Sequence, residues 1–111
     1  MTIRRLKESS AVRARDEQLF ERLLGGPLTL GKALEGLRLG EDQSLAGFGR
    51  RIGLSAQKLC DLEKGRRHVS PERAAQIARK LGHPEAVFVR LALQDLVDAG
   101  GLRFKVQVEA A

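Results

Sequence analysis

The hydrophobic residues of this chain recur at three- and four-residue intervals in five successive segments, each bounded by residues that begin or end helices. The segment after Thr29 illustrates the pattern, because its apolar positions 30, 33, 34 and 37 fall on one helical face before Gly40. Polar residues fill the opposite faces, as expected of helices that cover a core. The pattern predicts helices over residues 29–40, 44–53, 55–64, 70–82 and 84–99.

The ends of these helices are predicted from capping residues. Thr29, Ser44, Ser55 and Ser70 each precede a helical segment, where a hydroxyl oxygen can accept a hydrogen bond from a free backbone N–H. His83 is expected to be a weak cap for the last helix. Glycines mark the ends of four segments, namely Gly40, Gly53, Gly65 and Gly82.

The two ends of the chain follow other patterns. Residues 16–24 carry a short apolar helical face that ends at a Gly-Gly-Pro sequence. Residues 102–108 alternate apolar and polar side chains, which is the period of a strand. We therefore expect a basic, partly disordered arm with a short helix at 1–27, a helical domain at 28–99 and a strand-forming tail at 100–111. A single strand needs a partner, so the tail is a candidate for pairing with a second copy or another protein.

Size and composition agree with one helical domain. The chain has 111 residues, and its only aromatic side chains besides histidine are four phenylalanines. The core must therefore consist mainly of Leu, Ile, Val and Ala, which suits packed helices. The last predicted helix, at 84–99, is apolar beyond a single stripe, which indicates that part of it packs against a second copy.

The formal net charge of +6 is concentrated in two places. Residues 1–15 contain five basic side chains and one acidic one, and residues 50–67 contain six basic and two acidic ones. Two basic clusters on a nearly neutral body indicate a polyanionic partner.

Several classes of protein are not expected. Cys60 is the only cysteine, so an intramolecular disulfide cannot form, and no apolar run approaches the roughly 18 residues of a membrane span. The histidines, His68 and His83, form no metal-binding pattern with Cys60, and no catalytic set or phosphate-binding loop is present. We expect a cytoplasmic protein that is not an enzyme, with no cofactor, no metal and no membrane partner.

The segment from Ser44 to Gly65 has the pattern of two short helices that meet near a right angle across a tight turn. Such a crossing needs a very small residue, which Gly49 supplies, and a turn residue tolerant of positive φ, which Gly53 supplies. Apolar residues must anchor both helices from below: Phe48, Ile52, Leu54, Leu59 and Leu62. Glu63 is expected to form a structural bond between the two helices.

This arrangement leaves the outer face of helix 55–64 free. Gln57 can contact adenine with two hydrogen bonds, Ala56 can meet a thymine methyl group, and Asp61 can accept from cytosine N4 or pair with a neighbouring arginine. These three are the candidate base-reading residues. The candidate phosphate contacts are Ser44, Ser55, Lys58, Arg66 and Arg67.

Residues 30–81 resemble the Xre family, the Cro and lambda-repressor-like helix-turn-helix domains. The resemblance rests on four motifs: Leu30-Gly31, the turn Ile52-Gly53-Leu54-Ser55, the segment Leu59 to Gly65, and the helix from Ala75 to Gly82. It implies an all-α, five-helix lambda-repressor-like bundle, here with a short extra N-terminal helix and a short C-terminal β-strand. It also implies that Ala56, Gln57 and Asp61 lie where the family reads bases, with Ser44, Lys58 and Arg66 near phosphates.

Two functions follow from these features. The first is a transcriptional repressor that binds double-stranded DNA as a homodimer, joined through helix 84–99, strand 102–108 or both. The second is a protein-interaction module, most specifically the antitoxin of a toxin–antitoxin pair, since the small size, the Xre-like core and the extra terminal segments resemble antitoxins. Such an antitoxin would bind a protein toxin through its terminal segments and repress its own operon.

Overall fold

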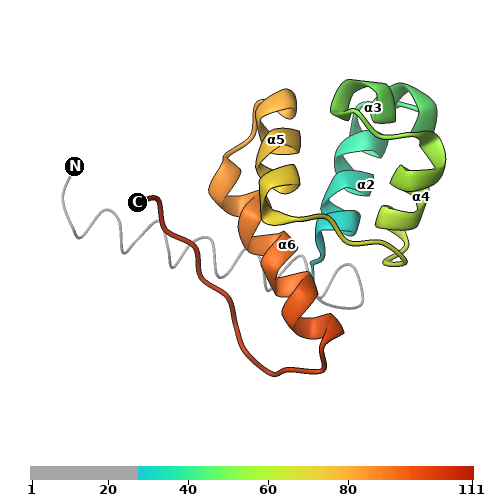
Figure 1. Ribbon diagram of the computed structural model, residues 1–111. Coiled ribbons are helices and arrows are strands. Elements are labelled where there is room, and N and C mark those ends of the chain that lie inside the picture. The colour runs from blue at the N-terminus through green and yellow to red at the C-terminus, as the bar shows by residue number, and fades with distance from the viewer. Residues whose placement is uncertain (1–27) are drawn as a thin grey trace.

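The computed structural model describes residues 28–111, which form five α-helices (Figure 1). The helices are α2 (Leu30–Gly40), α3 (Leu45–Ile52), α4 (Ala56–Glu63), α5 (Pro71–Leu81) and α6 (Glu85–Ala99). All five helices predicted from the sequence within this range are confirmed. The predicted helix at 16–24, like the rest of the arm at 1–27, lies outside the described residues.

Serine and threonine side chains begin four of the helices, as predicted. The hydroxyl oxygens of Thr29, Ser44, Ser55 and Ser70 each accept from a backbone N–H three residues further on, at 3.0 or 3.1 Å. The predicted His83 cap is wrong, because Pro84 occupies the N-cap of α6 and no side chain bonds there.

His83 stabilises the start of α6 in a different way. Its ring stacks on Phe88, one turn into α6, with the ring centroids 5.9 Å apart and the planes within 14° of parallel. This contact joins the residue before the cap to the fourth helical residue, which is how a hydrophobic staple fixes the entry of a helix.

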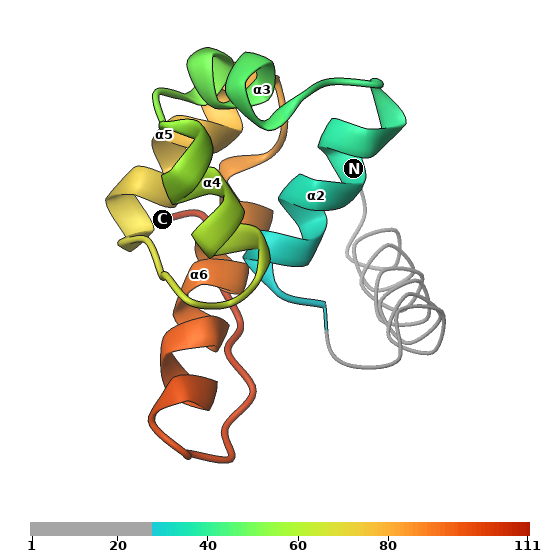
Figure 2. The ribbon, with the colours of Figure 1, turned by 90° about the vertical axis from the view of Figure 1, so that its right-hand side faces the viewer.

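The helices pack in two groups around one aliphatic core. α5 packs along α6, while α4 packs against both α2 and α3 (Figures 1 and 2). Contacts of α5 with α3 and of α6 with α2 join the two groups. The fully buried side chains include one from each helix of both groups: Leu34, Ile52, Leu59, Ile77 and Leu91. Among the described aromatic residues, Phe48 and Phe88 complete this core.

One ion pair fixes α4 to α2. Arg38 donates from Nε and Nη2 to the two carboxylate oxygens of Glu63, both at 2.9 Å, and from Nη1 to the carbonyl of Gln43 at 3.1 Å. The two side chains are 15% and 5% exposed. The bond from Glu63 to α3 that the sequence suggested is therefore wrong, since its partner comes from α2. The two residues are 25 positions apart in the sequence, so they come together only when the chain folds.

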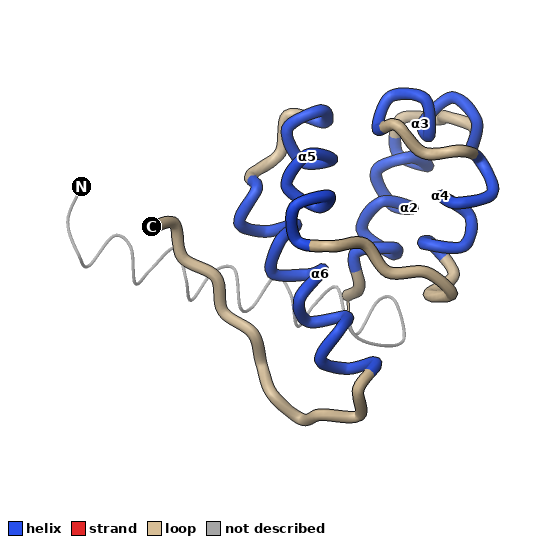
Figure 3. Tube along the Cα trace, in the orientation of Figure 1, coloured by secondary structure: helices blue, strands red, loops and turns tan. Residues whose placement is uncertain are grey.

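The tail does not form the predicted strand. Within the described residues no strand is present, and residues 102–111 run as a loop back beside α6 (Figure 3). A strand requires a neighbouring backbone, and here the tail has instead the side-chain amide of Gln94. Gln94 Nε2 donates to the Phe104 carbonyl at 2.8 Å, and Val106 N–H donates to Gln94 Oε1 at 2.8 Å.

Candidate nucleic-acid interface

The turn between α3 and α4 depends on two glycines, as predicted. A Cβ on Gly49 would lie 2.4 Å from the carbonyl oxygen of Leu54, so a larger residue would push the turn away from α3. Gly53 ends α3 in the left-handed conformation, with φ of 75°. The Leu54 N–H then donates back to the Gly49 carbonyl at 2.8 Å, which closes the turn.

A second close approach sets the position of α4. A Cβ on Gly31 would lie 2.0 Å from the carbonyl oxygen of Leu62, so the start of α2 lies directly against the end of α4. The sequence pattern did not predict that position 31 needs a residue without a side chain. Together, Gly31 and Gly49 allow α4 to lie close to both of its neighbours.

The outer face of α4 is open to solvent. Figure 2 shows α4 in front of the other helices, with no other described helix crossing it. Ala56, Gln57 and Lys58 are exposed on its first turn, while Leu59 and Leu62 point into the core. The candidate reading residues at 56 and 57 therefore lie where a DNA groove could reach them.

Asp61 connects Gln57, one of the candidate reading residues, to the loop that follows α4. Its Oδ1 accepts from Gln57 Nε2 at 3.0 Å, and from Arg66 Nε and Nη2 at 3.1 and 2.9 Å. The Arg66 guanidinium holds the pKa of the Asp61 carboxyl below its usual value of 3.8. Of the two roles that the sequence left open for Asp61, pairing with arginine is the one seen here.

This network orients the Gln57 amide. One hydrogen of Nε2 is used by Asp61, which leaves the second hydrogen and Oε1 for another partner. Those two groups are the donor and the acceptor that the N7 and N6 edge of adenine requires. Asp61 thus fixes the orientation of the Gln57 amide and leaves one donor and one acceptor free.

The candidate phosphate contacts differ in whether their polar groups are already used within the protein or are free to bind a phosphate. The hydroxyls of Ser44 and Ser55 accept from the backbone of their own helices, so they cap α3 and α4. Lys58 and Arg67 are exposed cations. Arg66 is also exposed, but Asp61 compensates part of its charge.

The turn has cationic neighbours that the sequence did not predict. Arg73 of α5 donates from Nη2 to the Gly53 carbonyl at 2.6 Å, and Lys80 Nζ lies 3.1 Å from where a Gly53 Cβ would be. Both residues lie at least 20 positions from Gly53, and no local signal could have joined them to it. Arg73 fixes the turn against α5, and both residues add positive charge beside it.

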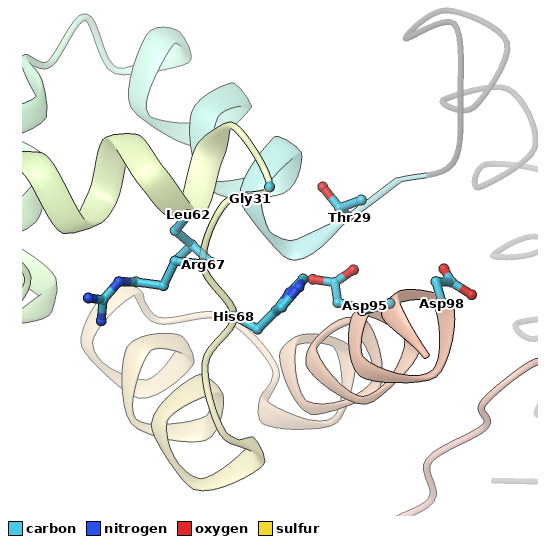
Figure 4. Close-up of a pocket in the computed structure, with 9 residues that line it drawn as sticks. Thr29, Gly31, Leu62, Arg67, His68, Asp95 and Asp98 are labelled. Carbon is cyan, nitrogen blue, oxygen red and sulfur yellow. The ribbon is translucent and has the colours of Figure 1, made fainter. Parts of the chain in front are cut away.

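A shallow pocket lies at the other end of α4. Thr29, Leu62, His68 and Asp95 are among the residues that line it, and the Asp95 carboxylate points toward the His68 ring (Figure 4). Asp95 is buried and accepts from the Leu30 N–H at 3.2 Å, so it caps α2 from α6. Burial raises the pKa of Asp95, while the Leu30 hydrogen bond and His68 oppose that rise. In residues 28–111 no group of His, Cys, Asp and Glu side chains could hold a metal ion.

Comparison with known protein families agrees with this geometry. A family described as a helix-turn-helix domain matches residues 29–91, which is more than half of the chain and includes all of α2 to α5. The chain belongs to this helix-turn-helix family, which indicates a DNA-binding protein. Searches among curated proteins and among solved structures gave no significant match. None of the helices in residues 28–111 is long and apolar enough to cross a bilayer.

Proposed function

We propose that this protein is a sequence-specific transcriptional regulator of the Xre type, a cytoplasmic repressor that inserts α4 into the major groove of double-stranded DNA. The observation that carries the proposal is the open first turn of α4, where Gln57 is oriented by Asp61 beside exposed cations. An α-helix with a uniquely oriented amide on its exposed face suits direct reading of base edges.

The side chains divide into two roles in this proposal. Gln57 reads a base, with Ala56 against a neighbouring thymine methyl group, and Asp61 either holds Gln57 or accepts from a cytosine amino group. Lys58, Arg66 and Arg67 neutralise phosphates and fix the register. The backbone N–H groups at the starts of α3 and α4, beside Ser44 and Ser55, add phosphate contacts.

A homodimer forms part of the proposal, because one recognition helix reads too few base pairs to select a site in a genome. Two copies of α4 would contact half-sites about one helical turn apart, roughly 34 Å between centres. Exposed apolar residues on α6 and the tail, among them Leu96 at 45% exposure and Phe104 at 68%, offer a surface for the second copy.

Selection from a random duplex library with the full-length chain tests this function. We expect an enriched motif with two-fold symmetry and half-sites about 10 base pairs apart. Lys58→Ala should weaken binding to every sequence alike and should lower the salt slope by about one per copy. An unenriched library, or enrichment of single-stranded DNA only, would contradict the proposal.

A second candidate is the antitoxin of a toxin–antitoxin pair. It is favoured by the tail, whose Leu102 and Phe104 side chains are 53% and 68% exposed and could bind a protein toxin. Native mass spectrometry of the protein from its own host distinguishes the two. A toxin complex that disappears on deletion of residues 102–111, with DNA binding intact, supports the antitoxin. Joint loss of self-association and DNA binding supports the homodimeric regulator alone.

A further inference from the structure

The tail is held along α6 by a side chain that imitates one edge of a β-ladder. The Gln94 amide donates to the Phe104 carbonyl and accepts from the Val106 N–H, each at 2.8 Å. In an extended chain, a carbonyl and an N–H two residues apart face the same edge. The two bonds of Gln94 have the spacing of such a chain, so the segment from Phe104 to Val106 lies as a strand would, without a second strand.

The opposite edge of the tail faces outward. In an extended chain the backbone groups of successive residues point to alternate edges, so those of Arg103, Lys105 and Gln107 point away from Gln94. The described part of the chain gives these backbone groups no hydrogen-bond partner. An open edge of this kind is a template for another strand.

The side chains of the tail divide by face as well. Leu102 and Phe104 are more than half exposed, and Leu96 of α6 is 45% exposed. Val106 and Val108 on the same face are half-buried. The apolar side chains and the open backbone edge belong to the same segment, residues 102–108. A partner strand would bond to the edge and place its own side chains beside the exposed apolar ones.

We propose that the tails of two copies pair as an antiparallel two-stranded ribbon with Val106 on the two-fold axis. In this register, Arg103 lies opposite Glu109 of the second copy, Phe104 opposite Val108, and Lys105 opposite Gln107. Each pair occurs twice, and opposite charges and aromatic–β-branched pairs are among those that stabilise antiparallel strands. The partner is therefore a second copy of this chain, selected by charge complementarity within its own tail.

The neighbouring registers are less favourable. An axis at Lys105 places two lysines directly opposite each other, which destabilises the pair. An axis at Gln107 pairs Lys105 with Glu109, but leaves Arg103 and Phe104 opposite alanines. A two-stranded ribbon alone is marginal in water, and here each strand is also held by Gln94 of its own α6.

The inference rests on the homodimer of the proposed function, but it is tested without DNA. Sedimentation equilibrium of the full-length chain should show a dimer that Arg103→Glu weakens about tenfold and Glu109→Arg weakens similarly. The double variant restores the opposite charges, so its dissociation constant should return to within about threefold of the original. Lys105→Glu is the matched control, and it should change dimerisation by less than about threefold, because Gln107 lies opposite it.

A wild-type chain that remains monomeric overturns the inference. So does a Lys105→Glu variant that dissociates as readily as Arg103→Glu, or a double variant that is not restored. Specific DNA binding by a chain that fails these tests would leave the role of α4 standing. A dimer that behaves as expected but binds no DNA would instead contradict the proposed function alone.

A cross-link measures the register independently. Val106→Cys in a Cys60→Ser background should form an intermolecular disulfide, because a non-hydrogen-bonded antiparallel pair has Cα atoms about 4.5 Å apart, within disulfide range. Val108→Cys in the same background is the control, since its two copies would lie about 13 Å apart. Equal cross-linking of both variants on a non-reducing gel would contradict the register.

Discussion

At the scale of single residues, the motif depends on places where one backbone touches another. Gly31 and Gly49 leave no room for a Cβ, because the carbonyl oxygens of Leu62 and Leu54 would lie at 2.0 and 2.4 Å. Gly36, in the middle of α2, has no atom from outside its own helix backbone within 4 Å of that position. All three glycines lie in helices, but only Gly31 and Gly49 have another part of the backbone against them.

Gly49→Ala should therefore destabilise the protein by about 2 kcal/mol or more, since the carbonyl of the turn must shift. Gly36→Ala should have the opposite sign and stabilise by about 0.5–1 kcal/mol, because alanine favours the helix and meets no obstacle. Urea unfolding followed by circular dichroism measures both. If the two substitutions have equal effects, close packing is not the reason for Gly49.

The ion pair between Arg38 and Glu63 also acts at this scale. Glu63→Gln removes the charge from a nearly buried site and should lower the free energy of unfolding by about 2 kcal/mol. The matched control is Glu41→Gln, which breaks the exposed pair with Arg51 and should change stability by less than about 1 kcal/mol. Similar losses for both would show that the position of Glu63 between α4 and α2 is unimportant.

At the scale of the helices, local sequence predicted most of what is found. The four hydroxyl caps and the glycine stop at Gly53 act within one turn of the residues they serve, so spacing alone reveals them. The cap that Asp95 gives to α2, and the contact of Arg73 with the turn, join residues 65 and 20 positions apart. Such contacts depend on packing, and no pattern along the chain contains them. The error at His83 is of another kind, because its contact with Phe88 is local and Pro84 takes the N-cap position.

The caps also predict how stability changes with pH. Burial raises the folded-state pKa of Asp95 above its unfolded value near 3.8, so the folded protein binds a proton more readily than the unfolded one. As pH falls from neutral toward 3.8, the wild type should gain stability relative to Asp95→Asn, which cannot ionise and keeps an oxygen for the Leu30 N–H.

The pKa of Asp61 is shifted in the opposite direction from that of Asp95. Arg66 lowers its folded-state pKa, so its ionised form contributes stability above pH 3.8 that is lost as pH falls through the folded value. The wild type should therefore lose stability relative to Asp61→Asn at acid pH. Thermal unfolding from pH 7 to 3 measures both differences, and the same sign for the two variants would contradict these assignments.

At the scale of the whole molecule, the sequence predicted the helical bundle, the turn and the open face of α4 better than it predicted the tail. The alternation of residues 102–108 predicted a strand, and that prediction is wrong for the single chain, because a strand also requires a partner backbone, which periodicity cannot supply. The candidate base-reading residues were likewise named one by one, without the bonds that connect them. The sequence suggested an arginine partner for Asp61, but it did not connect Gln57 to that pair. The structure joins Gln57, Asp61 and Arg66 in one hydrogen-bonded network.

The most direct test of the central claim is the base preference of Gln57→Ala. Binding of this variant to the selected duplex, and to duplexes with single base-pair changes, should be compared at one salt concentration with that of Glu72→Ala, an exposed residue on α5. We predict that Gln57→Ala loses about 1–3 kcal/mol of discrimination at one position of each half-site, while Glu72→Ala keeps the wild-type profile. Equal losses of Gln57→Ala on selected and random DNA would contradict the claim that α4 reads the bases.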